Sequence, residues 1–450
     1  MIEINYESII PDIERLINDR NQGALLNILI DLHPADIEEI LNRLKKDDRK
    51  YLFEILPPDL AGDVIPELDT PVVEDVLDGV SEKKISQLID NMESDDAADL
   101  VGDLPDDVAQ KVLEHAEDEV SQEVKELLHY DEDTAGGIMA LEYLAMPETA
   151  TVNETIEKIR EARDDIDDLY NIWVVDDERR LIGSVSLTDL VLAKGYSTLR
   201  EIMNVDIHFV KTDMDQEEVA NFFRKYDLVS APVVNEKKQI VGRITIDDVI
   251  DVLEEEGSED ISFIAGAPDE EIMEDSPFVL SKARVPWLLV AFIGEIIAAF
   301  ILNSFEATIS QKLMTAFFIP IIMAMGGSTG QQASVIVVRG LATGDINLSD
   351  LRSRLLRELK ITLLNGSFFA TLIFIIVFLW NGITFAIILA VSMFVVINYA
   401  GIVGSLIPFL FKKLSIDPAL AAAPFVSTSN DIVGLLIYLT ITTLSLTYFG

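Results

Sequence analysis

Between residues 32 and 128 an apolar residue recurs every twelve positions, and turn or capping residues follow several of these anchors. Segments such as LHPADIEEIL and LPDDVAQKVL carry Pro and Asp where the first turn of a helix favours them. Most anchors are followed eight positions later by a second apolar residue. This spacing predicts a small α-solenoid of short helices over about 20–130, within an acidic helical domain over 1–131. The anchors are Leu32, Leu44, Leu56, Leu68, Val80, Met92, Leu104, Ala116 and Leu128, and the second set is Ile40, Leu52, Val64, Val76, Leu88, Leu100 and Val112.

A duplicated module follows the predicted solenoid. WVVDDERRLIGSVSLTDLV, from Trp173, and PVVNEKKQIVGRITIDDVI, from Pro232, align without a gap. Each copy has the pattern of a strand, a charged turn, a second strand and a helix, preceded by a helical stretch. The duplication resembles a tandem pair of CBS domains, which are α/β folds, and we expect the pair over 132–256.

CBS pairs often bind adenine nucleotides through Ser or Thr followed three residues later by Asp, with the Asp on the ribose hydroxyls. The resemblance therefore makes Ser186 with Asp189, and Thr245 with Asp248, candidates for binding ATP. The simpler interpretation is that these residues cap the helix that follows, since Ser and Thr are favourable N-caps.

The last third of the chain contains five apolar stretches of membrane-spanning length. They predict an all-α transmembrane domain over 285–450, joined to the rest by a connecting (plug) helix over 257–284. The second stretch contains MAMGGSTGQQAS, whose Gly and Ser residues either let helices approach closely or break the helix beside a polar path. The five stretches are 285–305, 313–338, 359–381, 383–410 and 419–447.

Charge divides the chain at the same place. The chain has 78 acids and 34 bases, of which seven acids and eight bases follow Val285, so residues 1–284 hold 71 acids and 26 bases. A surface this acidic attracts cations and repels nucleic-acid phosphates. We therefore expect no nucleic-acid partner. The chain has no cysteine, which excludes disulfides and thiolate metal sites. Its N-terminal residues do not resemble a secretory signal.

The bases near the spans predict an orientation. Lys282 and Arg284 precede the first span, five bases lie between 339 and 360, and Lys412 and Lys413 follow the fourth, whereas the opposite loops hold only Lys312. The excess of bases on one side predicts a cytoplasmic N-terminus and, with five spans, an external C-terminus in the cell membrane.

Two acids, Glu295 and Asp431, fall inside predicted spans. A charge at the centre of a span costs at least about 2.5–3.5 kcal/mol and usually marks an ion or proton pathway. Asp431 follows a run of Ser, Thr and Asn, which indicates a surface lined by water, and we assign it to a pathway for a cation or a proton. Glu295 is either a paired structural acid or part of a helix interface.

The whole chain resembles the MgtE family of magnesium channels in domain order and in four motifs. These are MESDDAADLVGDLP, ITIDDVIDVLEEEGSEDI, MAMGGSTGQQASVIVVRGLATGDI and IDPALAAAPFVSTSNDIVGLLIYL. The resemblance implies downhill Mg²⁺ uptake by a homodimer, with one Asp431 per subunit facing a pore on the two-fold axis. Glu295 has no counterpart in these motifs.

The resemblance also implies that cytoplasmic acids sense Mg²⁺ and close the pore when they bind it. Asp248 is then a candidate for both metal and nucleotide. The alternative function is a membrane-anchored, nucleotide-sensing CBS protein. The sequence shows no HExxH motif, which would indicate a metalloprotease, and no phosphate-binding loop, which would indicate an ATP-driven pump. The implied regulatory ligands are Asp95, Asp99, Asp248, Asp251, Glu256, Glu259, Asp260 and Asp417.

Overall fold

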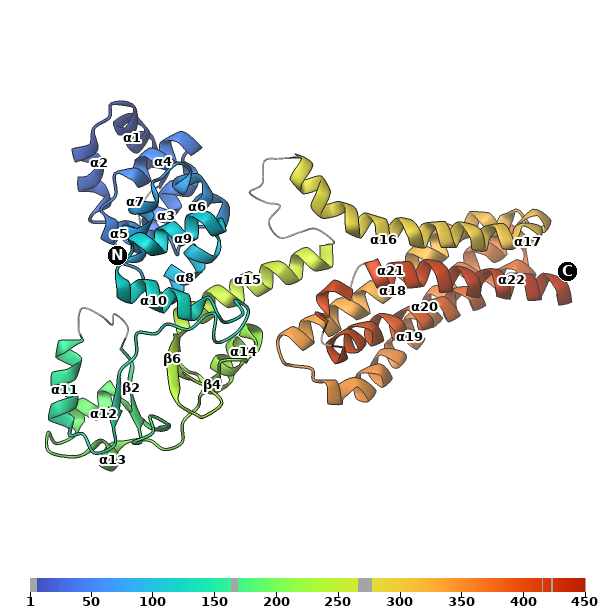
Figure 1. The fold of residues 1–450 in the computed structure, drawn as a ribbon. Coiled ribbons are helices and arrows are strands. Elements are labelled where there is room, and N and C mark those ends of the chain that lie inside the picture. Colours follow the sequence, from blue (N-terminus) through green and yellow to red (C-terminus); the bar gives the residue numbers. More distant parts are fainter. Residues whose placement is uncertain (1–5, 163–168, 266–276, 415, 422–423, 450) are drawn as a thin grey trace. The chain divides into compact units, whose positions relative to one another are not determined.

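The computed structural model describes residues 6–162, 169–265, 277–414, 416–421 and 424–449. The chain forms two compact units that divide between Leu253 and Glu254 (Figure 1). Each unit is described by itself below.

The first unit begins with ten short helices, as the twelve-residue repeat predicts. From α3 onward, each helix begins two residues after an apolar anchor, where Pro, Ser, Thr or a charged residue stands. The helices are α1 (Tyr6–Asn18), α2 (Gln22–Leu29), α3 (Pro34–Arg43), α4 (Lys46–Glu54), α5 (Pro58–Val64), α6 (Thr70–Leu77), α7 (Glu82–Ile89), α8 (Ser94–Gly102), α9 (Asp106–His115) and α10 (Asp118–Leu127).

The second apolar residue of each repeat forms the core of this stack. All seven members, from Ile40 to Val112, are at most 5% exposed. Helices α3, α5, α7 and α9 pack in succession, and so do α4 with α6 and α8 with α10. The period therefore produces two layers of alternating helices, because consecutive helices fall on opposite sides of the shared core.

The duplicated module folds into two three-stranded sheets, β1-β2-β3 and β4-β5-β6, each with its first strand parallel and its last antiparallel to the middle one. Val174 lies opposite Gly183 in one sheet and Val233 opposite Gly242 in the other, the same pairs that align in the sequence. The CBS prediction is confirmed. The elements are β1 (Ala145–Pro147), α11 (Val152–Glu161), β2 (Asn171–Val175), β3 (Leu181–Ser186), α12 (Leu187–Leu192), α13 (Leu199–Ile202), β4 (Val210–Lys211), α14 (Gln216–Tyr226), β5 (Ser230–Val234), β6 (Ile240–Thr245) and α15 (Ile246–Ala265).

The second unit contains five helices long and apolar enough to cross a membrane, over Leu280–Ser304, Met314–Ala342, Leu348–Asn381, Ile383–Lys413 and Phe425–Tyr448. The number of spans agrees with the sequence prediction. Residues 257–284 comprise the end of α15, residues 266–276, which lie outside the description, and the start of α16. The elements are α16 (Pro277–Ser304), α17 (Glu306–Gln311), α18 (Met314–Ala342), η2 (Leu348–Asp350), α19 (Leu351–Asn381), α20 (Ile383–Lys413), η3 (Ala419–Ala421), α21 (Pro424–Ser429), η4 (Asn430–Gly434) and α22 (Leu435–Phe449).

The glycines of the second span do not break it. Helix α18 runs without interruption through MAMGGSTGQQAS, so the sequence-based suggestion of a broken helix is wrong. The close-approach alternative is correct, because a Cβ on Gly404 of α20 would lie 2.2 Å from the carbonyl oxygen of Gly330. A backbone this close to its neighbour requires glycine, and α20 packs against α18, α19 and α22 at the centre of the bundle.

Candidate ion-binding sites

The interruption predicted for the second span occurs instead in the fifth, at Asp431. Helix α21 ends at Ser429, residues Asn430–Gly434 form a π-helical turn, and α22 continues from Leu435. A π-turn inside an α-helix leaves irregular backbone hydrogen bonding and is frequent at functional sites. Asp431 therefore lies where the span departs from regular geometry, and its side chain is partly exposed.

Asn430 fixes this turn against α18. Its side-chain Nδ2 donates to the carbonyl oxygen of Met323 at 3.0 Å and lies 3.5 Å from Oδ1 of Asp431. A Cβ on Gly326 would lie 2.2 Å from Asn430 Oδ1, so the first glycine of the GGSTG segment makes room for this amide. The Ser429 hydroxyl is held 2.8 Å from the hydroxyl of Tyr399 on α20.

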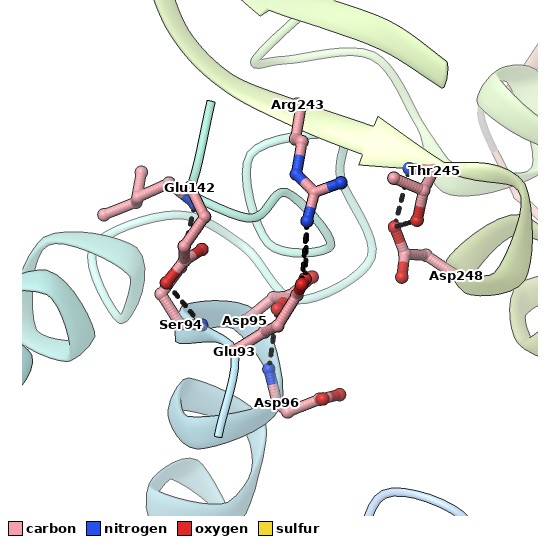
Figure 2. Close-up of polar contacts among 9 residues, drawn as sticks. Glu93, Ser94, Asp95, Asp96, Glu142, Arg243, Thr245 and Asp248 are labelled. Atoms are coloured by element: carbon pink, nitrogen blue, oxygen red, sulfur yellow. Dashed lines mark hydrogen bonds and ion pairs between the residues drawn. The ribbon is translucent and has the colours of Figure 1, made fainter. Parts of the chain in front are cut away.

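A second candidate site lies in the first unit, where the start of α8 contacts the CBS pair (Figure 2). Nη2 of Arg243, on β6, donates to both carboxylate oxygens of Glu93, at 2.7 and 3.0 Å. The Ser94 hydroxyl and backbone N–H both donate to Glu142, at 2.8 and 3.2 Å, and the Leu141 N–H donates to the Ser94 hydroxyl at 2.8 Å. We call these interactions the docking contact, because they join residues about 50 to 150 positions apart.

Acidic side chains gather beside the docking contact. Burial, and after it repulsion by the acids Asp248, Glu93, Asp99 and Asp251, together raise the pKa of Asp96 to about 8. Burial is also the main cause that raises the pKa of Asp95, well above its ordinary value, and of Glu93, to about 7, although Arg243 opposes the latter shift. The docking contact thus brings carboxyls from α8 and α15 together with too little positive charge to balance them.

Sequence-predicted sensor residues fall into two groups. Asp95 is buried at the start of α8 and lies near Asp248 in the first turn of α15, whereas Asp99 and Asp251 are exposed beside them. Glu256 and Glu259 lie further along α15 and are partly exposed; the side chain of Asp260 lies outside the description. Asp417 follows α20, and its Oδ1 accepts the N–H of Ala419 at 2.9 Å.

The acids of α8 and of the start of α15 approach one another without forming a closed metal site. Across the described ranges, no three His, Cys, Asp or Glu side chains are arranged so that they could hold a metal ion by themselves. Mg²⁺ fits such an open arrangement, because it keeps several waters and is usually bound by one or two carboxylates. The carboxyls beside the docking contact are partly dehydrated and repel one another. A bound Mg²⁺ would relieve this repulsion, so they are suitable ligands for the ion.

Ser186 makes the capping interaction that the simpler interpretation predicts, whereas in the second module the Asp248 side chain accepts from Thr245 instead. Ser186 Oγ accepts the Asp189 N–H at 3.0 Å and donates to the Asp189 carboxylate at 2.7 Å. In the second module the Thr245 N–H and hydroxyl both donate to Oδ2 of Asp248, at 2.7 and 2.8 Å. Asp248 therefore takes part in this contact with Thr245 and in the acidic cluster at once.

Several site residues were not anticipated from the sequence. Asp96 is adjacent to a predicted ligand, and its place within MESDDAADLV was the available signal. Glu93, Glu142 and Arg243 had no sequence signal, since their contacts join segments that are distant along the chain.

These features define a multi-pass membrane protein with an acidic helical domain and a CBS pair. Three family models match: the MgtE intracellular N domain over residues 32–133, the CBS domain over 135–195 and 199–255, and the MgtE divalent cation transporter over 319–441. The chain is 35% identical to the magnesium transporter MgtE of Thermus thermophilus, over 98% of this chain and 99% of that one. It is 30% identical to MgtE of Bacillus subtilis over 98% of both chains. The protein belongs to the MgtE family.

Two solved structures resemble the first unit. The soluble part of a magnesium transporter has a TM-score of 0.52 and 27% identity, and it covers 56% of this chain and 99% of its own. The cytosolic domain of the Mg²⁺ channel MgtE in complex with ATP has a TM-score of 0.51 and 33% identity, over 54% of this chain and 99% of its own.

Proposed function

We propose that this protein is a Mg²⁺ channel that admits the ion to the cytoplasm down its electrochemical gradient and closes when cytoplasmic acids bind Mg²⁺. The observation that carries the proposal is Asp431, an acid inside a membrane span, on a π-helical turn tied to α18 by Asn430. None of the ion pairs among the described residues includes Asp431, so a passing cation is its natural counter-ion.

The acids of the first unit belong on the cytoplasmic side in this proposal, with the C-terminus outside. The basic residues at the ends of the second and fourth spans, with those at the start of the third, support this orientation. An inside-negative potential then favours cation entry by about 2.3 kcal/mol per charge for each 100 mV. Uptake needs no other energy source.

The pore of this proposal lies on the two-fold axis of a homodimer. Mg²⁺ loses its hydration shell reluctantly, so a carboxylate recognises it best through the bound waters. A symmetric dimer presents two equivalent Asp431 side chains to such an ion without any further sequence requirement. The spacing between the two carboxylates would then select the hydrated ion by size.

Gating follows from the docking contact. Without Mg²⁺, the buried carboxyl of Asp95 and the half-buried carboxyls of Asp96 and Asp248 oppose contact between α8 and the second CBS domain. Bound Mg²⁺ relieves the repulsion and stabilises the contact, which requires that the ion bind the docked form more tightly than the undocked form. The docked first unit then acts through the connecting segment to hold the pore shut, with Glu256, Glu259, Asp260 and Asp417 as further Mg²⁺ ligands.

ATP is the proposed second ligand of the CBS pair. The ATP complex of a related cytosolic domain supports this, as do the pairs Ser186 with Asp189 and Thr245 with Asp248. Since Asp248 also lies in the acidic cluster, nucleotide binding and Mg²⁺ binding are expected to influence each other.

Flux into proteoliposomes tests the channel. Purified protein is reconstituted with an entrapped Mg²⁺ indicator, and an inside-negative K⁺ diffusion potential is imposed. We expect Asp431→Asn to reduce Mg²⁺ entry at least tenfold, while Asp345→Asn, the same change at an exposed position after α18, leaves it unchanged. Wild-type flux through the Asp431→Asn variant would overturn the proposal.

A further inference from the structure

The structure brings a second acid to Asp431. Helix α16 packs against α21 and η4, and this contact is close at Gly294, where a Cβ would lie 2.3 Å from Thr428 Cγ2. Glu295 is the next residue along α16, and Asp431 lies three positions after Thr428. The Glu295 carboxyl and the Ser427 hydroxyl both lie beside the Asp431 carboxyl.

This pair lacks a basic partner. No ion pair among the described residues includes Glu295, and Lys312 is the sole base between the start of the first predicted span and Arg339. Glu295 is exposed in the single chain, although it lies in the middle of a span where a charge facing lipid would be costly. Two adjacent carboxylates also repel each other unless a proton or a cation lies between them. Both costs fall if the pair faces a path that cations enter.

Asn430 keeps its own amide out of this pair. Its side chain is 2% exposed, Nδ2 donates to the carbonyl oxygen of Met323, and Oδ1 lies against Gly326 of α18, where a Cβ would be 2.2 Å from it. The acceptors gathered beside the turn are therefore the two carboxyls. A hydrated Mg²⁺ presents O–H donors in every direction, so it complements such a pair.

We propose that Glu295 is a second ion-recognition residue, which binds the hydrated divalent cation together with Asp431 of the same subunit. This inference rests on the proposed channel function and adds to it. Each subunit would contribute two carboxylates from two different helices, so that the site distinguishes divalent from monovalent cations by charge as well as by size. Gly294 serves the site indirectly, because its missing side chain lets α16 approach α21.

The expected effect of losing one of the two charges follows from Coulomb attraction. A divalent ion and a carboxylate about 5 Å apart in water attract each other strongly enough to change affinity on the order of tenfold. Glu295→Gln keeps the size of the side chain and removes the charge. We therefore expect this variant to bind the ion more weakly while the helix contact persists.

The experiment measures Mg²⁺ flux into proteoliposomes against Mg²⁺ concentration, with and without hexaamminecobalt(III) as an exchange-inert mimic of the hydrated ion. Glu295→Gln should raise the half-saturating Mg²⁺ concentration and the half-inhibitory concentration of the mimic, each about tenfold. Glu295→Asp, which keeps the charge, should restore both toward wild type. Glu306→Gln, the same change at an exposed position just after α16, is the matched control.

The outcomes separate the two proposals. If Asp431→Asn abolishes flux while Glu295→Gln leaves both concentrations at wild-type values, the role of Glu295 is overturned and the channel stands. If Glu295→Gln lowers the melting temperature and the maximal flux without moving either concentration, Glu295 is structural and the inference is likewise overturned. If Asp431→Asn also conducts normally, the channel proposal itself fails.

Discussion

Neutralising Asp96 should make the docked form more stable when Mg²⁺ is absent. Burial first, and then repulsion by neighbouring acids, raises the pKa of Asp96 from 3.8 to about 8 in the docked form. A docked form with the higher pKa binds more protons than an undocked one, so docking is favoured as pH falls from about 8 toward 4 and opposed as pH rises. The ordinary pKa of Asp96 lies roughly three pH units below pH 7. At pH 7, therefore, the difference in proton binding disfavours docking by about 4 kcal/mol relative to low pH.

Asp96→Asn removes the charge and keeps the shape, but the amide must still be desolvated. We therefore expect a net gain of about 2 kcal/mol, or roughly thirtyfold in the docking equilibrium at pH 7 without metal. The gain from added Mg²⁺ should shrink in the same variant, because one acid that the ion would neutralise is gone.

The absence of cysteine makes a clean measurement possible. Spin labels on cysteines introduced at the exposed positions Gln110, on α9, and Lys237, in the second CBS domain, report the docked fraction by pulsed electron paramagnetic resonance distances. The full-length protein is measured in detergent with EDTA from pH 5.5 to 8.5. Asp118→Asn, an equal charge change at the exposed start of α10, is the control.

The reasoning is refuted if the metal-free docked fraction of the wild type does not depend on pH. It is also refuted if Asp96→Asn docks no better than Asp118→Asn at pH 7. A docked fraction that rises as pH falls, with a weaker dependence in the Asp96→Asn variant, is the expected result.

Three further predictions concern other contacts. Arg243→Met leaves the partly buried Glu93 without its cation, so we expect the free energy of docking to weaken by about 3–5 kcal/mol in the same spin-label measurement. Adding Glu93→Gln should restore most of this loss, and a double variant that is not restored would contradict the ion-pair explanation. Gly404→Ala places a Cβ 2.2 Å from a carbonyl oxygen of α18 and should destabilise the membrane bundle by about 1–3 kcal/mol. This loss should appear as a lower melting temperature in detergent. Gly257→Ala, whose new Cβ would have no atom within 4 Å, should leave the melting temperature unchanged. Ser186→Ala removes the cap of α12 and should lower the unfolding free energy of the CBS pair by about 1 kcal/mol in denaturant titrations; an unchanged midpoint would show that the cap contributes nothing.

Sequence patterns predicted the helices and strands correctly where a repeat in the sequence was regular. The twelve-residue spacing predicts the position of every helix from α3 to α10, because a buried apolar residue and a capping position recur within each short repeat. The alignment of the two modules likewise predicts the strand register, since Val174 and Gly183 pair as Val233 and Gly242 do. These features depend on neighbours close in sequence, so composition and spacing suffice.

The GGSTG segment shows where such reasoning stops. Glycine and serine in a span indicate either a break or a close helix contact, and the choice depends on what packs against them. Here Asn430 and Gly404 occupy the space that the glycines leave, so α18 stays regular and the irregular turn falls at Asp431 in the fifth span. No local signal distinguished the two.

The sequence alone determined the order of domains, the number of spans, the acidity of the first unit and the presence of an intramembrane acid at Asp431. The tertiary structure alone decided that Glu93 meets Arg243 and that Glu295 meets Asp431, pairs separated by more than a hundred residues. Periodicity and composition record what a segment does with its own neighbours. A charge pair across the fold depends on helix packing, which many residues set together and which no single stretch of sequence specifies.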